Sequence, residues 1–152
     1  MAESAFRARA SSDQIILNPG PFNLFFQTVE YDLNGEYNPA TSTFVSSEGG
    51  VYTISVSLLL VANPQVEFVA LVLEGPNNSG RLFIRNTDKP DFPFTVNFTA
   101  QMNFNPGDSM RVFLVPNAGV VRVVADPILN HWEAARTDGG VGPQGPQGPQ
   151  GV

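Results

Sequence analysis

Cysteine is absent from the 152-residue chain, which excludes disulfide bonds, thiol catalysis and cysteine-ligated zinc sites. The chain has one lysine, one histidine and a formal net charge of -6. Because polyanion binding needs clustered Lys and Arg, nucleic acid is not an expected partner. No apolar run approaches the roughly 18 residues needed to span a bilayer, so we expect no membrane insertion. The first ten residues lack the apolar stretch of a secretory signal, and no signal peptide is expected there.

Patterns of catalytic residues are also scarce. His131 could pair with Glu133 as acid and base, or it could simply be a polar neighbour of Trp132. Asp88 and Asp91 could offer oxygen ligands to Ca²⁺, but their spacing fits no calcium-loop motif, and a solvated turn is the alternative. Phosphate-binding glycine loops, nucleophile elbows and metal-ligand clusters do not occur in the sequence. We therefore expect no enzyme, and no cofactor beyond the calcium alternative.

Short alternating segments separated by Gly, Pro and Asn turns fill most of the chain. The clearest is 92–104, in which apolar residues alternate with uncharged polar ones, and 51–60 repeats this pattern. This pattern of segments and turns predicts about ten strands, at 5–10, 22–28, 43–46, 51–60, 66–73, 81–86, 92–104, 110–115, 120–125 and 129–136. Ten strands in one domain favour two packed antiparallel sheets, as in a sandwich or jelly roll.

The polar positions of the two clearest strands carry no charge, although solvent-facing strands usually carry Lys, Glu, Asp or Arg. These positions are Thr53, Ser55, Ser57, Thr95, Asn97, Thr99 and Gln101. Small uncharged side chains suit a contact between subunits. The alternative is that Thr and Ser simply favour strands.

The end of the chain reads "GGVGPQGPQGPQGV" and has a strict period of three. Its glycines fall at Gly139, Gly142, Gly145, Gly148 and Gly151. This is the Gly-X-Y repeat of collagen, which makes a stable structure only when three chains wind together around a glycine-filled axis. We expect a head at 4–138, followed by the start of a collagen-like Gly-Pro-Gln stalk at 139–152. The head must then tolerate or form a threefold homotrimer.

Three motifs resemble those of C1q/TNF-like globular heads. They are "AFRA" at 5–8, the run from "LFFQTVEYDLNGEYNP" to "GGVYTISVSLLL" at 24–60, and "FNPGDSMRVFL" at 104–114. The resemblance implies an all-β, ten-stranded antiparallel jelly-roll sandwich that assembles as a compact trimer with its inner sheet facing the threefold axis. The uncharged positions would then be the natural interface.

Two features depart from that family's pattern. The chain has "PILNHWEAAR" at 127–136 where family members usually have a Phe-Ser-Gly-Phe-like last strand, and the head precedes the collagen-like segment. In this order the chain looks like the N-terminal cap of a bacterial or phage collagen-like protein, a group that includes proteins of spore surfaces. We expect it outside the cell or on a spore, cell or phage-fibre surface.

Two functions follow as hypotheses. The first is a structural homotrimerisation head that aligns three chains and nucleates or caps a collagen-like triple helix in a surface or fibre protein. The alternative is an adhesin-like recognition head that binds a glycan or protein through its loops. The loop candidates for that binding are Asn34, Glu36, Asn77, Asn78, Asp88 and Asp91.

Overall fold

The computed structural model describes residues 2–17, 21–63, 65–76, 80–85 and 93–137, the segment 80–85 by its backbone alone. Thirteen strands and no helix occur in these ranges, so none of the described residues forms a helix that could cross a membrane. The strands are β1 (Ala5–Arg9), β2 (Gln14–Leu17), β3 (Phe22–Asn23), β4 (Thr28–Asp32), β5 (Tyr37–Asn38), β6 (Thr43–Val45), β7 (Gly50–Ala62), β8 (Phe68–Glu74), β9 (Gly80–Arg85), β10 (Pro93–Phe104), β11 (Ser109–Pro116), β12 (Val120–Val124) and β13 (His131–Arg136).

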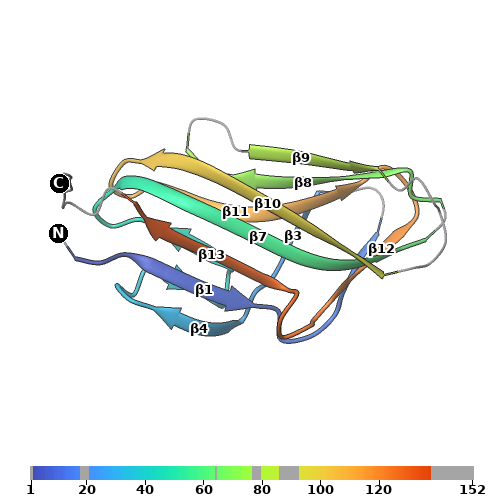
Figure 1. Ribbon diagram of the computed structural model, residues 1–152, viewed down its shortest axis with the longest axis horizontal. Helices are drawn as coiled ribbons and strands as arrows, with labels where there is room; N and C mark the ends of the chain where they lie inside the picture. The colour runs from blue at the N-terminus through green and yellow to red at the C-terminus, as the bar shows by residue number, and fades with distance from the viewer. Residues whose placement is uncertain (1, 18–20, 64, 77–79, 86–92, 138–152) are drawn as a thin grey trace.

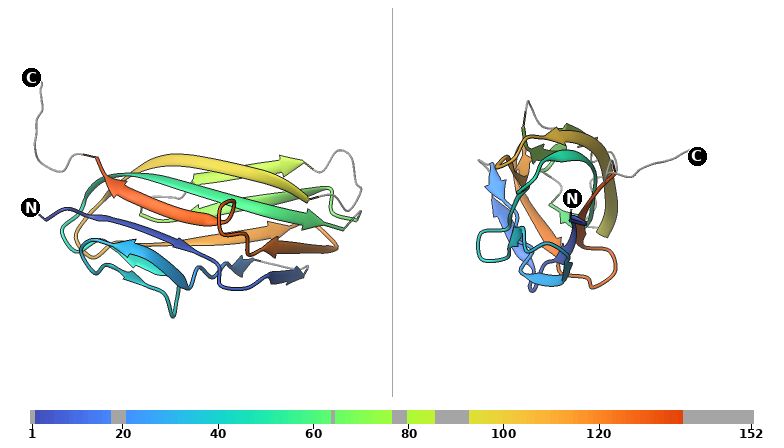
Figure 2. Two further views of the ribbon diagram at one scale, coloured as in Figure 1. Left: turned by 60° about the horizontal axis from the view of Figure 1, so that its bottom comes forward. Right: turned by 90° about the vertical axis from the view of Figure 1, so that its left-hand side faces the viewer.

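The strands form two sheets that pack face to face along the length of the molecule (Figures 1 and 2). The first sheet has the order β2-β12-β7-β13-β1-β4, with β10 on the other side of β7. The second has the order β5-β6-β11-β8-β9, with β3 also paired to β11. All pairings among the described strands are antiparallel. The expected all-β sandwich is confirmed.

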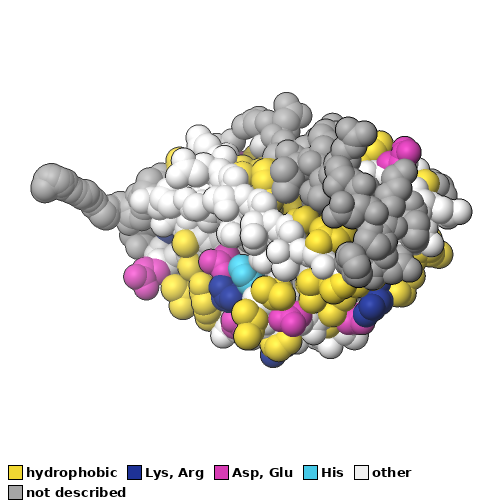
Figure 3. Space-filling view, turned by 45° about the vertical axis from the view of Figure 1, so that its right-hand side comes forward, with side chains coloured by type: hydrophobic (Ala, Val, Ile, Leu, Met, Phe, Trp, Pro, Cys, Tyr) yellow, Lys and Arg dark blue, Asp and Glu magenta, His cyan; other side chains and the backbone are white. Residues whose placement is uncertain are grey.

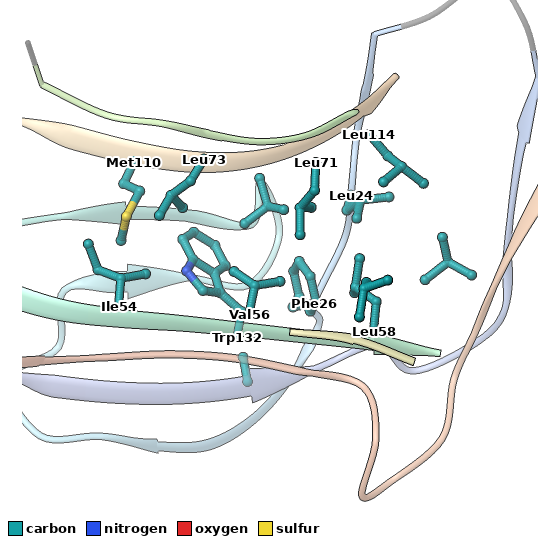
Figure 4. Packing of buried hydrophobic residues seen from close by; sticks show 14 of the residues in the cluster. Leu24, Phe26, Ile54, Val56, Leu58, Leu71, Leu73, Met110, Leu114 and Trp132 are labelled. Carbon is teal, nitrogen blue, oxygen red and sulfur yellow. The ribbon is translucent and has the colours of Figure 1, made fainter. Parts of the chain in front are cut away.

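The core lies between the sheets and follows from the period-two alternation. In β7 every second side chain from Tyr52 to Leu60 is buried, and residues of β8 and β11 cover them from the second sheet. Figure 4 shows Trp132 pointing from the first sheet into this layer, close to Ile54 and Val56. Full burial of one such apolar side chain contributes about 1.5–3 kcal/mol, and this row accounts for much of the contact between the sheets.

The first sheet is interrupted at one level along β7. One half of β7 pairs with β13, which pairs with β1, and the other half pairs with β12, which pairs with β2. The chain leaves the sheet both between β1 and β2 and between β12 and β13. The excursions at 10–13 and 125–130 are joined by Asn130, which is fully buried and whose Oδ1 accepts a hydrogen bond from the Ala10 backbone at 2.9 Å. The Asp13 carboxylate accepts one from the Ala125 backbone at 2.8 Å. Hydrogen bonds thus hold the two excursions together at the interruption of the sheet.

Most expected strands are present, and the exceptions lie near the N-terminus. The expected strand at 22–28 is wrong as a single element, because β3 pairs with the second sheet and β4 with the first. The chain crosses between the layers at 24–27, where the Gln14 side chain bonds both the N–H and the C=O of Phe25. β2, β5 and the part of β4 beyond Thr28 were not expected, and all three strands are short.

Candidate functional site: the outward face of the first sheet

The uncharged residues of β7 and β10 come together on the side of the first sheet that faces away from the core. In the register of the two strands, Thr99 lies opposite Ser55, Gln101 opposite Thr53 and Asn97 opposite Ser57. We call the seven residues Thr53, Ser55, Ser57, Thr95, Asn97, Thr99 and Gln101 the neutral band. It is visible as a white area in Figure 3. The predicted alternation is confirmed, since the apolar partners of these residues face inward.

The neutral band is open to solvent on β10 and more covered on β7. Thr95, Asn97, Thr99 and Gln101 are exposed, whereas Ser57 is buried and its hydroxyl donates to the Leu129 carbonyl at 2.9 Å. The Gln101 amide donates to the Thr53 hydroxyl at 3.2 Å. A second protein surface that packs on the neutral band would displace water from hydroxyl and amide groups but from no charged group of the band. The free-energy cost of desolvation is therefore lower than on a charged surface.

An ion cluster borders the neutral band on β13, β1 and β4. It consists of Arg7, Arg9, Glu30, His131 and Glu133. Arg7 pairs with Glu30 at 2.9 Å and also with Glu133, and Arg9 pairs with Glu30 at 3.3 Å. Only the two members on β13, His131 and Glu133, were predicted from the sequence. The alternating charges of "FRAR" in β1 are a signal in the sequence for the two arginines of the cluster.

His131 and Glu133 share a face of β13, as their spacing predicted. The His131 Nδ1 atom lies 3.4 Å from Glu133 Oε1, and the imidazole is mostly buried. Burial lowers the pKa of His131 and Arg7 lowers it further, whereas Glu133 and Glu30 act in the opposite direction. Among the described residues, no three His, Asp or Glu side chains converge in a way that would hold a metal ion.

The far end of the same face is apolar. Its most exposed side chains come from β2, the start of β12 and the excursion that follows it: Ile15, Leu17, Val120, Ile128 and Leu129. Ile128 is 75% exposed, and its loop is fixed by Asp126, whose carboxylate accepts bonds from the backbones of Ile128 and Leu129 at 2.8 Å each. These backbone bonds lower the pKa of Asp126. The outward face therefore combines neutral, ionic and apolar parts.

Comparison with known proteins identifies the fold. No protein-family model and no curated protein matches the chain. The solved globular domain of zebrafish complement 1qA matches with a TM-score of 0.65 and 14% identity over 89% of this chain and 97% of that one. The Eiger TNF structure from S. frugiperda matches with 0.59 and 15% over 97% and 100%, and murine APRIL at pH 8.0 with 0.64 and 11% over 88% and 98%. The chain has the C1q/TNF-like jelly-roll fold.

The fold predicted from the motifs is thereby confirmed. Sequence identities of 11–15% support the fold and no shared function. The atypical last segment of this C1q/TNF-like head is a regular strand. β13 lies in the middle of the first sheet, between β1 and β7, and its Trp132 is fully buried. The indole ring meets Phe6 edge-on at 5.0 Å and lies 5.6 Å from Tyr37. Aromatic packing of Trp132 thus holds the last strand of the head against the core.

The loop candidates differ in how accessible they are. Glu36, a loop candidate for ligand binding, is not on the accessible surface: its residue is 8% exposed, and its carboxylate accepts bonds from the Ser4 hydroxyl at 2.6 Å and the Ser47 backbone at 2.7 Å. Its burial raises the pKa, but these bonds outweigh that effect and lower it overall. Asn34 is half-buried and donates to the Ser47 hydroxyl at 3.3 Å.

Several other predicted residues lie outside the described part of the chain. They are the loop candidates Asn77, Asn78, Asp88 and Asp91, including both carboxylates of the calcium alternative, and the stalk glycines Gly139, Gly142, Gly145, Gly148 and Gly151.

Proposed function

We propose that this head assembles as a homotrimer through the outward face of the first sheet and aligns three collagen-like chains. The neutral band is the observation that carries the proposal, because seven uncharged side chains share one face of two long paired strands. Contact over the neutral band itself buries none of the formal charge that makes ordinary strand surfaces costly to cover. The resemblance to C1q/TNF-like heads and the Gly-X-Y period from residue 139, which needs three chains, support the same assembly.

The end of β13 supports a role in aligning the stalk. The Arg136 side chain is 1% exposed and donates to the Gly49 carbonyl at 3.1 Å and the Tyr52 hydroxyl at 3.3 Å. The Thr137 backbone donates to the Val51 carbonyl at 2.7 Å. The last described residues are therefore tied to the head, and little free chain separates them from the first triplet. We infer a surface or fibre protein outside the cell, such as one on a spore, cell or phage particle.

Sedimentation equilibrium of the full chain tests the assembly. We expect three times the 16.4 kDa chain mass at micromolar concentration. Thr99→Glu should yield a folded monomer, since Thr99 is exposed in the single chain and an unpaired carboxylate buried between copies costs on the order of 3–5 kcal/mol. Thr41→Glu, at an exposed position in the turn between β5 and β6, is the matched control and should remain trimeric. A monomeric wild type, or a trimeric Thr99→Glu variant, would refute the proposal.

A ligand-recognition head is the second candidate, and a groove on the second sheet favours it. The groove has a volume of about 510 Å³ and is lined by apolar side chains that include Phe68, Phe113 and Val115. Phe68 is 42% exposed, and such a lining suits apolar side chains of a peptide or protein partner. Phe68→Ser should keep the sedimentation mass and lose binding to apolar peptides on an array. Undiminished binding by this variant would count against recognition through the groove.

A further inference from the structure

The single histidine of the chain lies in the middle of the proposed assembly face. His131 is opposite Ser57 of the neutral band, and on the other side it adjoins the Arg7 and Arg9 strand. Its side chain is 17% exposed. Its Nδ1 atom is buried and makes no hydrogen bond within the described residues, although Glu133 Oε1 is 3.4 Å away. A contact between copies would cover what remains of the imidazole surface.

The charges around His131 already balance without it. Arg7 and Arg9 of β1 provide two positive charges, and Glu30 of β4 and Glu133 of β13 provide two negative ones. Both carboxylates are engaged by arginine, Glu30 by two of them. On the other side, β7 presents only uncharged serines to the imidazole. A proton on His131 would therefore add one unmatched positive charge to the cluster.

We propose that protonation of His131 weakens the assembly, so that the head trimer loosens in mildly acidic surroundings. The inference rests on the proposed homotrimer. Three copies around one axis would each carry the extra charge on a surface that has lost its water, where a charge without its own counter-ion is costly. The neutral imidazole avoids this cost. Histidine is the side chain whose ordinary titration range makes such a switch accessible near neutral pH.

The direction of the pH dependence follows from the environment of the imidazole. Burial and Arg7 hold the pKa of His131 below its ordinary value of 6.5. That environment is already present in the single folded chain. Assembly would remove more water from the imidazole and lower its pKa further, so the dissociated chain binds the proton more readily than the assembled form. The trimer is therefore most stable above about pH 6.5, where His131 is neutral in both forms, and it weakens as the pH falls and the dissociated chain takes up the proton.

The test compares the trimer at two pH values. Sedimentation of the full chain should give a smaller trimer-formation constant at about pH 5 than at about pH 7.5. For each unit by which assembly lowers the pKa of His131, the constant should fall about tenfold per subunit, and so about a thousandfold for the three subunits of a trimer. His131→Gln should remain trimeric at both values, and His131→Asn provides a second neutral variant should Gln fold poorly. Because the chain has one histidine, its imidazole NMR signal reports the protonation state directly.

The outcomes separate this inference from the proposed function. A trimer that persists at about pH 5 while the NMR signal shows a protonated imidazole overturns the switch and leaves the homotrimer standing. Equal acid dissociation of wild type and both neutral variants also overturns it, since carboxylates would then be responsible. A monomer at about pH 7.5 refutes the homotrimer and the switch together. Circular dichroism at each pH verifies that the chain stays folded.

Discussion

Tyr37 shows how one residue can hold the two sheets together. Its ring stacks on Phe6 with centroids 4.7 Å apart and an interplanar angle of 6°, and it meets Trp132 nearly edge-on at 5.6 Å. Its hydroxyl donates to the Phe26 carbonyl at 2.6 Å, inside the segment that crosses between the layers. The residue thus joins aromatic packing to a hydrogen bond that a buried carbonyl needs.

Removing that hydroxyl should weaken the head measurably. In Tyr37→Phe the ring packing stays, but the Phe26 carbonyl is left buried without its donor, at a cost of about 1–3 kcal/mol in the free energy of unfolding. Urea denaturation followed by tryptophan fluorescence measures the loss. Tyr31→Phe, which alters an exposed tyrosine, is the control and should be nearly neutral. Equal stability of wild type and Tyr37→Phe would contradict the role assigned to this bond.

Tyr37 should also show in the alkaline titration of the protein. Burial raises its pKa to about 12 from the ordinary value of 10.0. Because the folded pKa is the higher one, this stabilisation is present below about pH 10 and is lost as the pH rises toward 12. Ultraviolet absorbance of phenolate should therefore show a step near pH 12, and Tyr37→Phe should lack that step.

At the scale of elements, the sequence predicted the long strands well and the short ones poorly. β7 and β10 are 13 and 12 residues long, and apolar and polar residues alternate over 52–58 and 94–104, so that their period and their inward faces could be read directly. β3 and β5 have two residues each, and no periodicity can emerge from so short a segment. The crossing at 24–27 could not be foreseen either, since it depends on the amide of Gln14 from a different strand.

Part of the candidate face could likewise be predicted from the sequence and part could not. The neutral band could be predicted because all seven of its residues lie on β7 and β10, the two strands with clear alternation. The ion cluster required the pairing of β1 with both β4 and β13, including the irregularity between Arg7 and Ala8 that admits Glu30. Partners from three strands with a shifted register cannot be assigned from spacing along one chain.

At the scale of the whole molecule, the two ends of the described chain meet at one end of the sandwich. β1 begins and β13 ends there (Figure 1), and the Arg136 backbone donates to the Ser4 carbonyl at 2.9 Å. The buried Arg136 side chain also bonds the Ala2 carbonyl and lies 3.5 Å from Glu48. A stalk that continues from residue 138 therefore starts from a junction bonded on several sides, as the proposed alignment of three chains requires.

Cysteine cross-linking can test that alignment, because the natural chain has no thiol of its own. Val141 is the Y residue of the triplet that begins at Gly139. In Val141→Cys, three aligned chains should hold their thiols close enough to oxidise, since a disulfide needs Cα atoms within about 4.4–6.8 Å after small adjustments. Three thiols pair two at a time, so a non-reducing gel should show dimer rising to no more than about two thirds of the chains.

Two controls make the cross-linking result specific to a trimer. Ala40→Cys places an exposed thiol in the turn between β5 and β6, on the second sheet, and should cross-link only slowly and in proportion to protein concentration. Adding Thr99→Glu to Val141→Cys should bring its rate down to that of Ala40→Cys, because the head contact is then broken before the stalk can align. If the two cysteine variants oxidise equally slowly from the outset, the three chain ends do not emerge together, and the alignment proposal fails even where sedimentation finds a trimer.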